Sequence, residues 1–333
     1  MTRGRFLFVI GTTAALIIIA VLFRSDGVSA TTVAGSMLAT TLRFATPITL
    51  GALAGLFCER SGVVNIAIEG MMLSAAFGAF LIASYTGSLA LGLLAGMLTG
   101  GLMALLHAWL AVTFKVDQIV SGTVINILAI GLTGFLDSQV LRPAGLQSAG
   151  LMPRISIPIL SSLPVIGPLF QQQLIAWIAI ILVVVSHLVL FHTRWGLRTR
   201  AVGENPRAAD TVGINVRRMR YANVVIGGVI AGIGGAYLTL EGVPTFEALM
   251  TNGRGFIALA ALIFGGWTPW GAWAAALLFG SSNALQLNAQ QFGIPISPQF
   301  LGMFPYLLTI IILAGVIGRA YPPAAVGQPY DKE

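Results

Sequence analysis

The chain consists largely of apolar runs of about 20 residues, separated by short polar breaks. A helix needs about 20 residues to cross the roughly 30 Å hydrocarbon core of a lipid bilayer. Charged residues make up only 9% of the sequence, whereas soluble domains carry roughly 25%. The sequence therefore predicts an all-α, polytopic integral membrane helical bundle with no separate soluble domain.

These runs predict about ten transmembrane helices. They lie near residues 6–23, 36–57, 64–85, 89–113, 118–138, 173–192, 221–241, 255–267, 269–288 and 303–318. The run 255–267 is too short to cross upright, and it is also consistent with half of a broken helix paired with the segment after Pro269. A total of eight or nine spans therefore stays open.

The distribution of basic residues predicts the orientation of the bundle. With the N-terminus inside, thirteen arginines and lysines fall on the cytoplasmic side and four outside, as the positive-inside rule requires. Both termini are then cytoplasmic, together with the segment 193–220 and the tail 319–333, on which Asp331 is expected to lie free. The segment 139–172 is external, and its five prolines leave room for a short surface helix at most.

Glycines recur every four residues in several runs and so fall on one face of each helix. They are Gly51 and Gly55, Gly92, Gly96 and Gly100, and Gly228 and Gly232. Lipid supplies no hydrophobic drive between helices, so close packing depends on small residues. The stripes predict tight packing between helices of this chain, in preference to a dimer seam.

The sequence contains no motif for chemistry. A chain that hydrolysed ATP itself would need a glycine-rich loop ending in Gly-Lys-Ser/Thr, and neither lysine, Lys115 or Lys332, lies in one. The three histidines lack metal-ligand spacing, and Cys58 is the only cysteine. The net charge of +7 fits basic residues held inside and does not indicate nucleic acid. We expect no catalytic residue, no metal site and no cofactor in this chain.

The segment 193–220 contains a pattern typical of a short capped helix. Asn205 suits the N-cap, Pro206 the first helical position, and Gly213 the C-terminal stop. Orientation and contact with lipid phosphates would account for its seven arginines but not for this ordered spacing. The pattern favours a helix at 205–213 that docks in a groove of another protein.

Within this helix, Ala208-Ala209 followed, after three intervening residues, by Gly213 resembles a motif of ABC importer permeases. In that bacterial family, Ala-Ala-x-x-x-Gly forms the centre of the loop that contacts the ATPase. This sequence has Arg207 where classical members have an acid. It is therefore more similar to the ribose, branched-chain amino acid and nucleoside branch of the family.

Two further stretches resemble permeases of nucleoside and simple-sugar importers that work with basic-membrane-protein-type binding lipoproteins. One is residues 42–47 followed by 59–72, and the other is residues 253–260 followed by 264–267. All three motifs occur in the same order as in that family, and the similarity covers residues 40–318.

The resemblance implies a single transmembrane permease domain over residues 1–333 in the bacterial cytoplasmic (inner) membrane. It implies a non-catalytic subunit that transports nucleosides or simple sugars. The implied partners are an ABC ATPase that binds ATP and Mg, an extracytoplasmic substrate-binding lipoprotein, and a second homologous permease, with a homodimer left open. The ATPase-coupling residues that it implies are Gly203, Glu204, Asn205, Pro206, Ala208, Ala209 and Gly213.

Polar side chains inside the predicted spans are candidates for the translocation pathway. Asn65 and Glu69 are four residues apart and are expected to share a helix face, with Glu69 roughly 9 Å inside the membrane boundary. An ionisable group at that depth must be paired or solvated, so ion pairing competes equally with ligand contact. Pro47 is expected to free backbone groups near Arg43, which neighbours or water must satisfy. The candidates are Arg43, Asn65, Glu69, Asn126, Asn223 and Asn283.

Three other functions stay open. One is an ABC permease for branched-chain amino acids. A second is an ion-coupled secondary transporter, although that would need a cluster of acids or a proton relay near the membrane centre, and acids are scarce here. The third is a membrane enzyme or assembly factor. Dependence of uptake on ATP and on a binding protein separates these possibilities.

The predicted orientation assigns opposite sides to two loops. A topology reporter fused after Arg200 should report the cytoplasm, because this loop holds the largest group of basic residues. A reporter fused near Gly150 should report the outside. If both fusions report the same side, the number of spans between them is wrong.

Overall fold

The computed structural model describes residues 11–18, 29–291 and 321–331, and the positions 300, 302–303, 307 and 310. The long helices are α2 (Ala30–Arg60), α3 (Ile68–Thr86), α4 (Leu89–Ala108), α5 (Gln118–Leu136), α6 (Leu174–His192), α9 (Val216–Tyr237) and α11 (Pro269–Gln291). The shorter helices are α7 (Arg194–Glu204), α8 (Pro206–Thr211) and α10 (Arg254–Phe264). Three long helices end in π-helical turns: η1 (Trp109–Thr113), η2 (Asp137–Leu141) and η5 (Leu238–Gly242).

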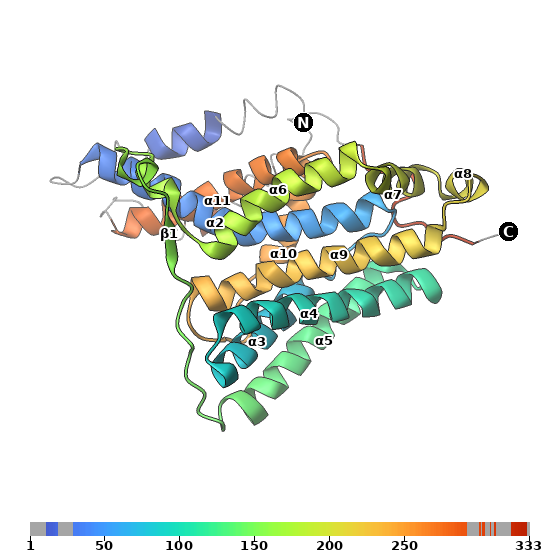
Figure 1. The fold of residues 1–333 in the computed structure, drawn as a ribbon, viewed down its shortest axis with the longest axis horizontal. Coiled ribbons are helices and arrows are strands. Elements are labelled where there is room, and N and C mark those ends of the chain that lie inside the picture. The colour runs from blue at the N-terminus through green and yellow to red at the C-terminus, as the bar shows by residue number, and fades with distance from the viewer. Residues whose placement is uncertain are drawn as a thin grey trace.

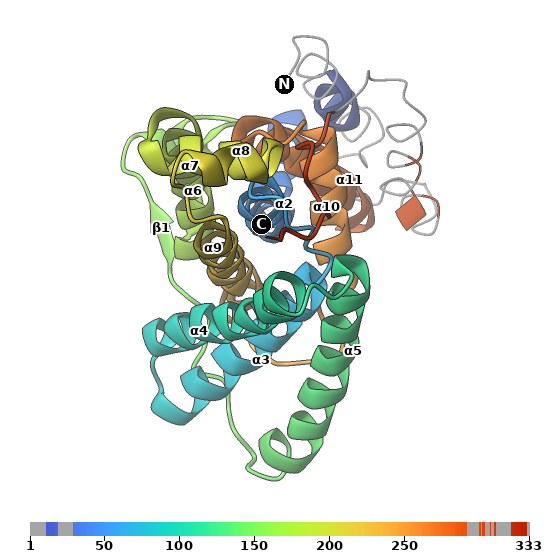
Figure 2. The same ribbon diagram turned by 90° about the vertical axis from the view of Figure 1, so that its right-hand side faces the viewer.

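Helix α2 is the centre of the bundle, and it contacts α3, α6, α7, α9, α10 and α11. In Figure 2, α3, α4 and α5 lie on one side of this helix and α6 and α11 on the other. A small two-stranded ribbon lies at one end of the bundle, and α7, α8 and the C-terminal tail lie at the other (Figure 1). We call these the ribbon end and the α7–α8 end.

Local sequence explains how α2 begins and how it accommodates a proline. The side chain of Ser29 accepts a hydrogen bond from Thr32 N and caps the first turn. Pro47 has no amide hydrogen to give to the carbonyl of Arg43 one turn earlier. The Tyr237 hydroxyl donates to that carbonyl instead, at 2.8 Å. The predicted need for a neighbouring partner near Arg43 is therefore confirmed.

The glycine stripes are seams between helices of this chain, as predicted. On α4, Gly92 and Gly100 face α3 and α9: a Cβ at Gly92 would lie 2.7 Å from the Ala83 Cβ, and one at Gly100 would lie 2.7 Å from the Gly232 Cα. Gly51 of α2 faces α10 in the same way, 2.7 Å from the Ala258 Cβ. Such distances leave no space for any side chain, so the backbones are in direct contact.

The predicted external loop contains the one departure from an all-α fold within the described part of the chain. Strands β1 (Arg154–Ser156) and β2 (Gln171–Gln173) pair antiparallel, and the 3₁₀ turns η3 (Leu160–Ser162) and η4 (Gly167–Phe170) lie between them. The prolines in this segment disfavour a helix, and residues before proline prefer extended conformations. Met152 N donates to Leu240 O at 2.8 Å and ties the loop to η5.

Six of the described helices are long and apolar enough to cross a membrane: residues 30–60, 68–86, 89–113, 118–141, 174–192 and 216–242. They match six of the predicted runs, although α2 begins at Ala30 because of the Ser29 cap. The predicted span 269–288 corresponds to α11, which is not among these six. Helix α10 is the short apolar helix that the broken-helix alternative predicted, and α11 follows it directly. The predicted spans 6–23 and 303–318 lie largely outside the described residues. The total of ten and the N-in, C-in orientation therefore stay predictions.

The α4–α9 seam predicts the effect of a single added methyl group. Gly100→Ala should lower the free energy of unfolding by about 1–3 kcal/mol, because the new Cβ meets backbone that cannot move aside. The control is Gly131→Ala on α5, where nothing lies within 4 Å of the new Cβ. Thermal unfolding of both purified variants in detergent measures the difference. Equal melting temperatures would show that the seam tolerates a side chain.

Candidate substrate cavity and coupling surface

A cavity of about 510 Å³ lies between α2, the α9–η5 junction and the segment 243–253. Its polar lining residues are Thr40, Arg43, Tyr237, Thr245, Glu247, Asn252 and Arg254. Phe44, Pro47, Leu238 and Met250 are among its apolar lining residues. Small-molecule sites typically have volumes of roughly 300–1,000 Å³ and combine apolar walls with a few polar groups. We call this the main cavity, and it is the candidate substrate site.

A second cavity, of about 370 Å³, adjoins the first at the ribbon end. The two share Thr40, Arg43 and Leu287 in their linings. The ribbon and its neighbours add Arg154, Gln171, Gln172 and Gln173, so this lining is polar. We call it the vestibule. Arg43 therefore lies where the vestibule meets the main cavity.

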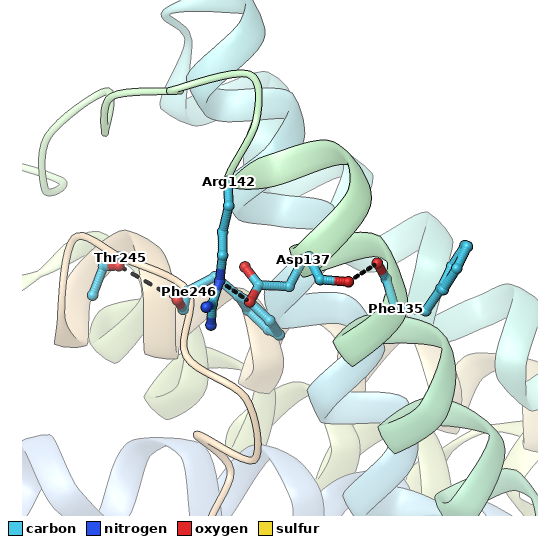
Figure 3. Close-up of polar contacts among 6 residues, drawn as sticks. Phe135, Asp137, Arg142, Thr245 and Phe246 are labelled. Carbon is cyan, nitrogen blue, oxygen red and sulfur yellow. Dashed lines mark hydrogen bonds and ion pairs between the residues drawn. The ribbon is translucent and has the colours of Figure 1, made fainter.

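The segment 243–253 forms one wall of the main cavity, and a side chain of this segment also packs against α3. The Phe246 ring is 6% exposed and packs edge-on against Phe77 of α3, with ring centroids 5.2 Å apart. Figure 3 shows this segment together with the end of α5, where Arg142 points to Asp137. Arg142 Nε donates to the Asp137 carboxylate at 2.9 Å. The Phe77–Phe246 contact fixes the connection from η5 back to α10, and the ion pair fixes the end of α5 beside it.

Glu69 fixes the start of α10. Its two carboxylate oxygens accept hydrogen bonds from Gly253 N, at 2.8 Å, and Gly255 N, at 2.6 Å. A carboxylate at a helix N-terminus satisfies amides that have no partner inside the helix and interacts favourably with the helix dipole. Gly255 allows this approach, because a Cβ there would lie 2.5 Å from Glu69 N. The predicted pairing of Glu69 is therefore with backbone amides of another helix.

The expectation that Asn65 and Glu69 share a helix face is wrong. Helix α3 begins only at Ile68, so Asn65 lies in the connection that precedes it. Its side-chain amide contacts the sulfur atoms of Cys58 and Met71, at 3.3 and 3.6 Å. The sequence 62–67 begins with Gly62 at φ +90°, a conformation that ends the previous helix. The spacing rule fails because it assumes a continuous helix.

Three other candidate pathway residues make hydrogen bonds within the bundle. Asn126 accepts from Gly70 N at 2.8 Å and donates to Ile66 O at 3.0 Å, joining α5 to the start of α3. Asn223 donates to Thr199 Oγ1 at 3.1 Å and joins α9 to α7. The Asn283 amide donates to a carbonyl of its own helix. Of the six candidates, Arg43 lines the main cavity; the transport role of all six stays a prediction.

Sequence reasoning missed most of the cavity lining. The predicted span limits left Glu247, Asn252 and Arg254 between the runs 221–241 and 255–267, and Tyr237 inside the first of these runs with no role of its own. A signal was present, because Arg254 follows Gly253 at the start of an apolar run too short to cross a membrane. A helix that begins inside the bundle brings the polar residues before it to the same depth.

The predicted helix in the segment 193–220 is present as α8. Asn205 Oδ1 accepts from Ala208 N at 3.0 Å, Pro206 occupies the first position, and Gly213 has φ +84°. Helix α7, which sequence reasoning missed, precedes it and is capped by Thr193, whose hydroxyl accepts from Gly196 N at 3.2 Å. The two helices form one surface at the α7–α8 end.

The two alanines of α8 face opposite ways. Ala209 is 3% exposed and packs on Val202, Val216 and Met219, so it is not the residue that an outside partner would touch. Ala208 is exposed. Val212, on the last turn, is 75% exposed.

The C-terminal tail is bound along this end, which corrects the expectation that Asp331 lies free. Asp331 pairs with Lys115. Two backbone hydrogen bonds, Ala325 N to Gly203 O at 2.9 Å and Gly327 N to Gly62 O at 3.1 Å, fix the path of residues 324–328. Glu204 accepts from Ala324 N at 3.2 Å. Gly203 and Glu204 thus contact the tail of their own chain.

Comparisons with known proteins agree on the kind of protein. A family model described as "Branched-chain amino acid transport system / permease component" matches residues 37–313. The chain is 42% identical over 306 residues to the guanosine ABC transporter permease protein NupQ of Bacillus subtilis, covering 88% of this chain and 95% of the relative. It is 41% identical to the nucleoside ABC transporter permease protein NupC of Lactococcus lactis, covering 89% and 96%. It is 28% identical to a second Bacillus subtilis guanosine permease protein, NupP, covering 77% and 75%.

The capping of α10 by Glu69 predicts a specific loss of stability. Glu69→Gln should lower the free energy of unfolding by about 1.5–3 kcal/mol, because the carboxamide loses the charge and keeps only one acceptor oxygen, and its NH₂ group cannot accept from the second backbone amide. The control is Glu247→Gln, which removes an exposed carboxylate from the same cavity but caps no helix. Thermal unfolding in detergent compares them. A control as destabilised as Glu69→Gln would refute the capping argument.

Proposed function

The chain belongs to the branched-chain amino acid transport system permease family, and we propose that it forms the membrane pathway for nucleosides in an ATP-driven ABC importer. The observation that carries the proposal is identity above 40% over nearly the whole chain to permeases named for guanosine and for nucleosides. Members of this family are integral membrane transport subunits and not enzymes. An ion-coupled carrier and a membrane enzyme are thereby set aside.

The chemistry of the main cavity supports a nucleoside. A nucleoside presents a flat aromatic base and a sugar with several hydroxyl groups. Phe44 and Tyr237 offer aromatic surface for the base, and Arg254, Asn252 and Glu247 offer donors and acceptors for the sugar and the base edge. A branched-chain amino acid would leave most of these groups without a partner. A simple sugar would use the polar groups but not the aromatic ones.

The proposed complex contains this chain, ABC ATPase subunits that bind ATP and Mg, an extracytoplasmic binding lipoprotein and a second, related permease. Two permeases of one organism that share the guanosine name are both similar to this chain, which supports a heterodimer. A homodimer is the alternative. In the membrane, we propose ten spans with both termini in the cytoplasm, so that the α7–α8 end faces the ATPase and the ribbon end faces the binding protein.

In this arrangement the substrate enters the vestibule from the binding protein and passes Arg43 into the main cavity. ATP binding closes the ATPase subunits against α8 and the exposed Ala208 and Val212. The bundle then changes between outward and inward access. Gly203, Glu204, Asn205, Pro206, Ala209 and Gly213 serve this step by holding α7, α8 and the tail in position.

Reconstitution tests the function. Proteoliposomes holding this chain, its genomic-neighbour ATPase and its second permease should take up radiolabelled guanosine only with ATP inside and the binding protein outside. Excess unlabelled adenosine should compete, whereas leucine and glucose should not. Uptake that is independent of ATP, or competition by leucine alone, would reject a nucleoside importer.

Docking on α8 predicts the effect of a bulky charge on its exposed face. Ala208→Arg should leave the membrane bundle intact but reduce the ATPase that co-purifies by about tenfold, the order expected when one interface contact becomes a clash. Val116→Arg is the matched control, because it adds the same charge on the turn before α5 at the same end. Wild-type amounts of ATPase on Ala208→Arg would contradict docking at α8.

A further inference from the structure

Helix α10 extends from the main cavity to the α7–α8 end without crossing the bundle. Its 11 residues span roughly 16 Å, about half of a hydrocarbon core. Its first residue, Arg254, and the preceding Asn252 line the main cavity. Glu69 holds this end through the amides of Gly253 and Gly255. The helix therefore begins at the candidate substrate site.

The other end of α10 is held by two consecutive residues at the end of α2. The Trp267 indole nitrogen donates to the Glu59 carboxylate at 2.5 Å. Arg60 donates from Nε and Nη2 to the Trp267 carbonyl, at 2.9 and 2.6 Å. Glu59 and Trp267 are almost fully buried, at 6% and 5% exposure. Side chain and backbone of Trp267 are thus both fixed by α2.

Trp267 also has an unfavourable backbone conformation. Its φ is +52°, in the left-handed region that a bulky side chain rarely adopts. Such a conformation persists only where the surroundings impose it, and it is found preferentially at functional sites. Here the hydrogen bonds to Glu59 and Arg60 impose it. A simple turn between two helices would not need a buried tryptophan in this position.

Arg60 connects this turn to α7. The guanidinium of Arg60 lies 5.7 Å from the centre of the Phe191 ring at the end of α6, and that of Arg200 from α7 lies 5.0 Å from the same ring. Gly203 of α7 also packs on the Arg60 backbone: a Cβ there would lie 2.9 Å from the Arg60 carbonyl carbon. Movement of α7 would therefore act on Arg60, which holds the Trp267 carbonyl.

Between its ends, α10 is one short helix bounded by two glycines. Gly253 at φ +78° precedes it, and Gly266 at φ +64° follows it. Along its length it packs closely on α2, where Gly51 faces Ala258 and Gly55 faces Leu262. Small residues at such a seam let two helices approach closely. This combination suits a helix that moves as a whole.

We propose that α10 is a connecting helix that transmits movement of α7 and α8 to the main cavity, with Trp267 and Glu59 as its positioning residues. This inference rests on the proposed function, because it assumes an ATPase that drives α8. It gives a short helix inside the bundle a mechanical role. Without the Trp267–Glu59 hydrogen bond, ATP hydrolysis should then continue while transport is lost.

The test measures nucleoside transported per ATP hydrolysed in proteoliposomes containing the complete complex. Trp267→Phe removes the indole donor, and Glu59→Leu removes the acceptor. Both variants should keep ATP hydrolysis within about twofold of wild type and lose about tenfold in transport per ATP, the size expected for a charge-assisted hydrogen bond. Trp270→Phe is the control, because this tryptophan is 44% exposed and lies three residues further along.

The results that would reject the connecting helix differ from those that would reject the proposed function. A wild-type ratio in Glu59→Leu, or a parallel loss of hydrolysis and transport, overturns the connecting helix and leaves Trp267 a purely structural residue. Equal uncoupling in Trp270→Phe overturns it as well. If Trp267→Phe does not assemble, Glu59→Leu decides alone. If the wild-type complex shows no ATP-driven guanosine uptake, the proposed function fails, whatever the variants do.

Discussion

The arrangement depends on the hydrogen bonds that Glu69 accepts from the start of α10. Inside a bilayer, backbone amides cannot turn to water, so a helix that starts there needs a partner from the protein. Glu69 supplies both acceptors to Gly253 and Gly255. Without them, the segment 243–253 could not end inside the bundle and line a cavity. The wall of the main cavity formed by residues 243–253 is therefore held by this one carboxylate.

A second backbone group that needs a hydrogen-bond partner shapes the opposite wall of the main cavity. Pro47 leaves the Arg43 carbonyl without its helical partner, and Tyr237 donates to it from α9. The proline thereby draws the end of α9 to α2 beside Arg43. All three residues line the main cavity. Polar groups that must be satisfied in lipid thus concentrate around one space, which is where a hydrophilic substrate needs them.

Much of this architecture could be predicted, because the strongest signals are local. Apolar length located the spans, four-residue glycine spacing located the seams, and the Asn205, Pro206 and Gly213 pattern located α8 with its caps. Each depends only on neighbours in the sequence. The comparisons support the family that the α8 motif and the two other stretches indicated.

What could not be predicted depends on residues distant in sequence. Asn65 was placed on a helix because four-residue spacing says nothing about where a helix starts. The inward direction of Ala209 follows from Val202 of α7 and from Val216 and Met219 of α9. The binding of the tail follows from Gly62, Gly203 and Lys115, which lie in three separate parts of the chain. None of these contacts leaves a periodic pattern or a motif in the sequence.

The C-terminal tail also enlarges the surface at the α7–α8 end. A capped helix alone would present only one narrow row of side chains to a partner protein. Here the residues 324–328 lie against α7 and the connection after α2, and the buried Arg220 of α9 donates to Gln328 O at 2.8 Å. Four parts of the chain are thereby joined into one surface. A force applied at α8 then reaches α2 and α9 together, and α2 is the helix on which α10 and the main cavity both rest.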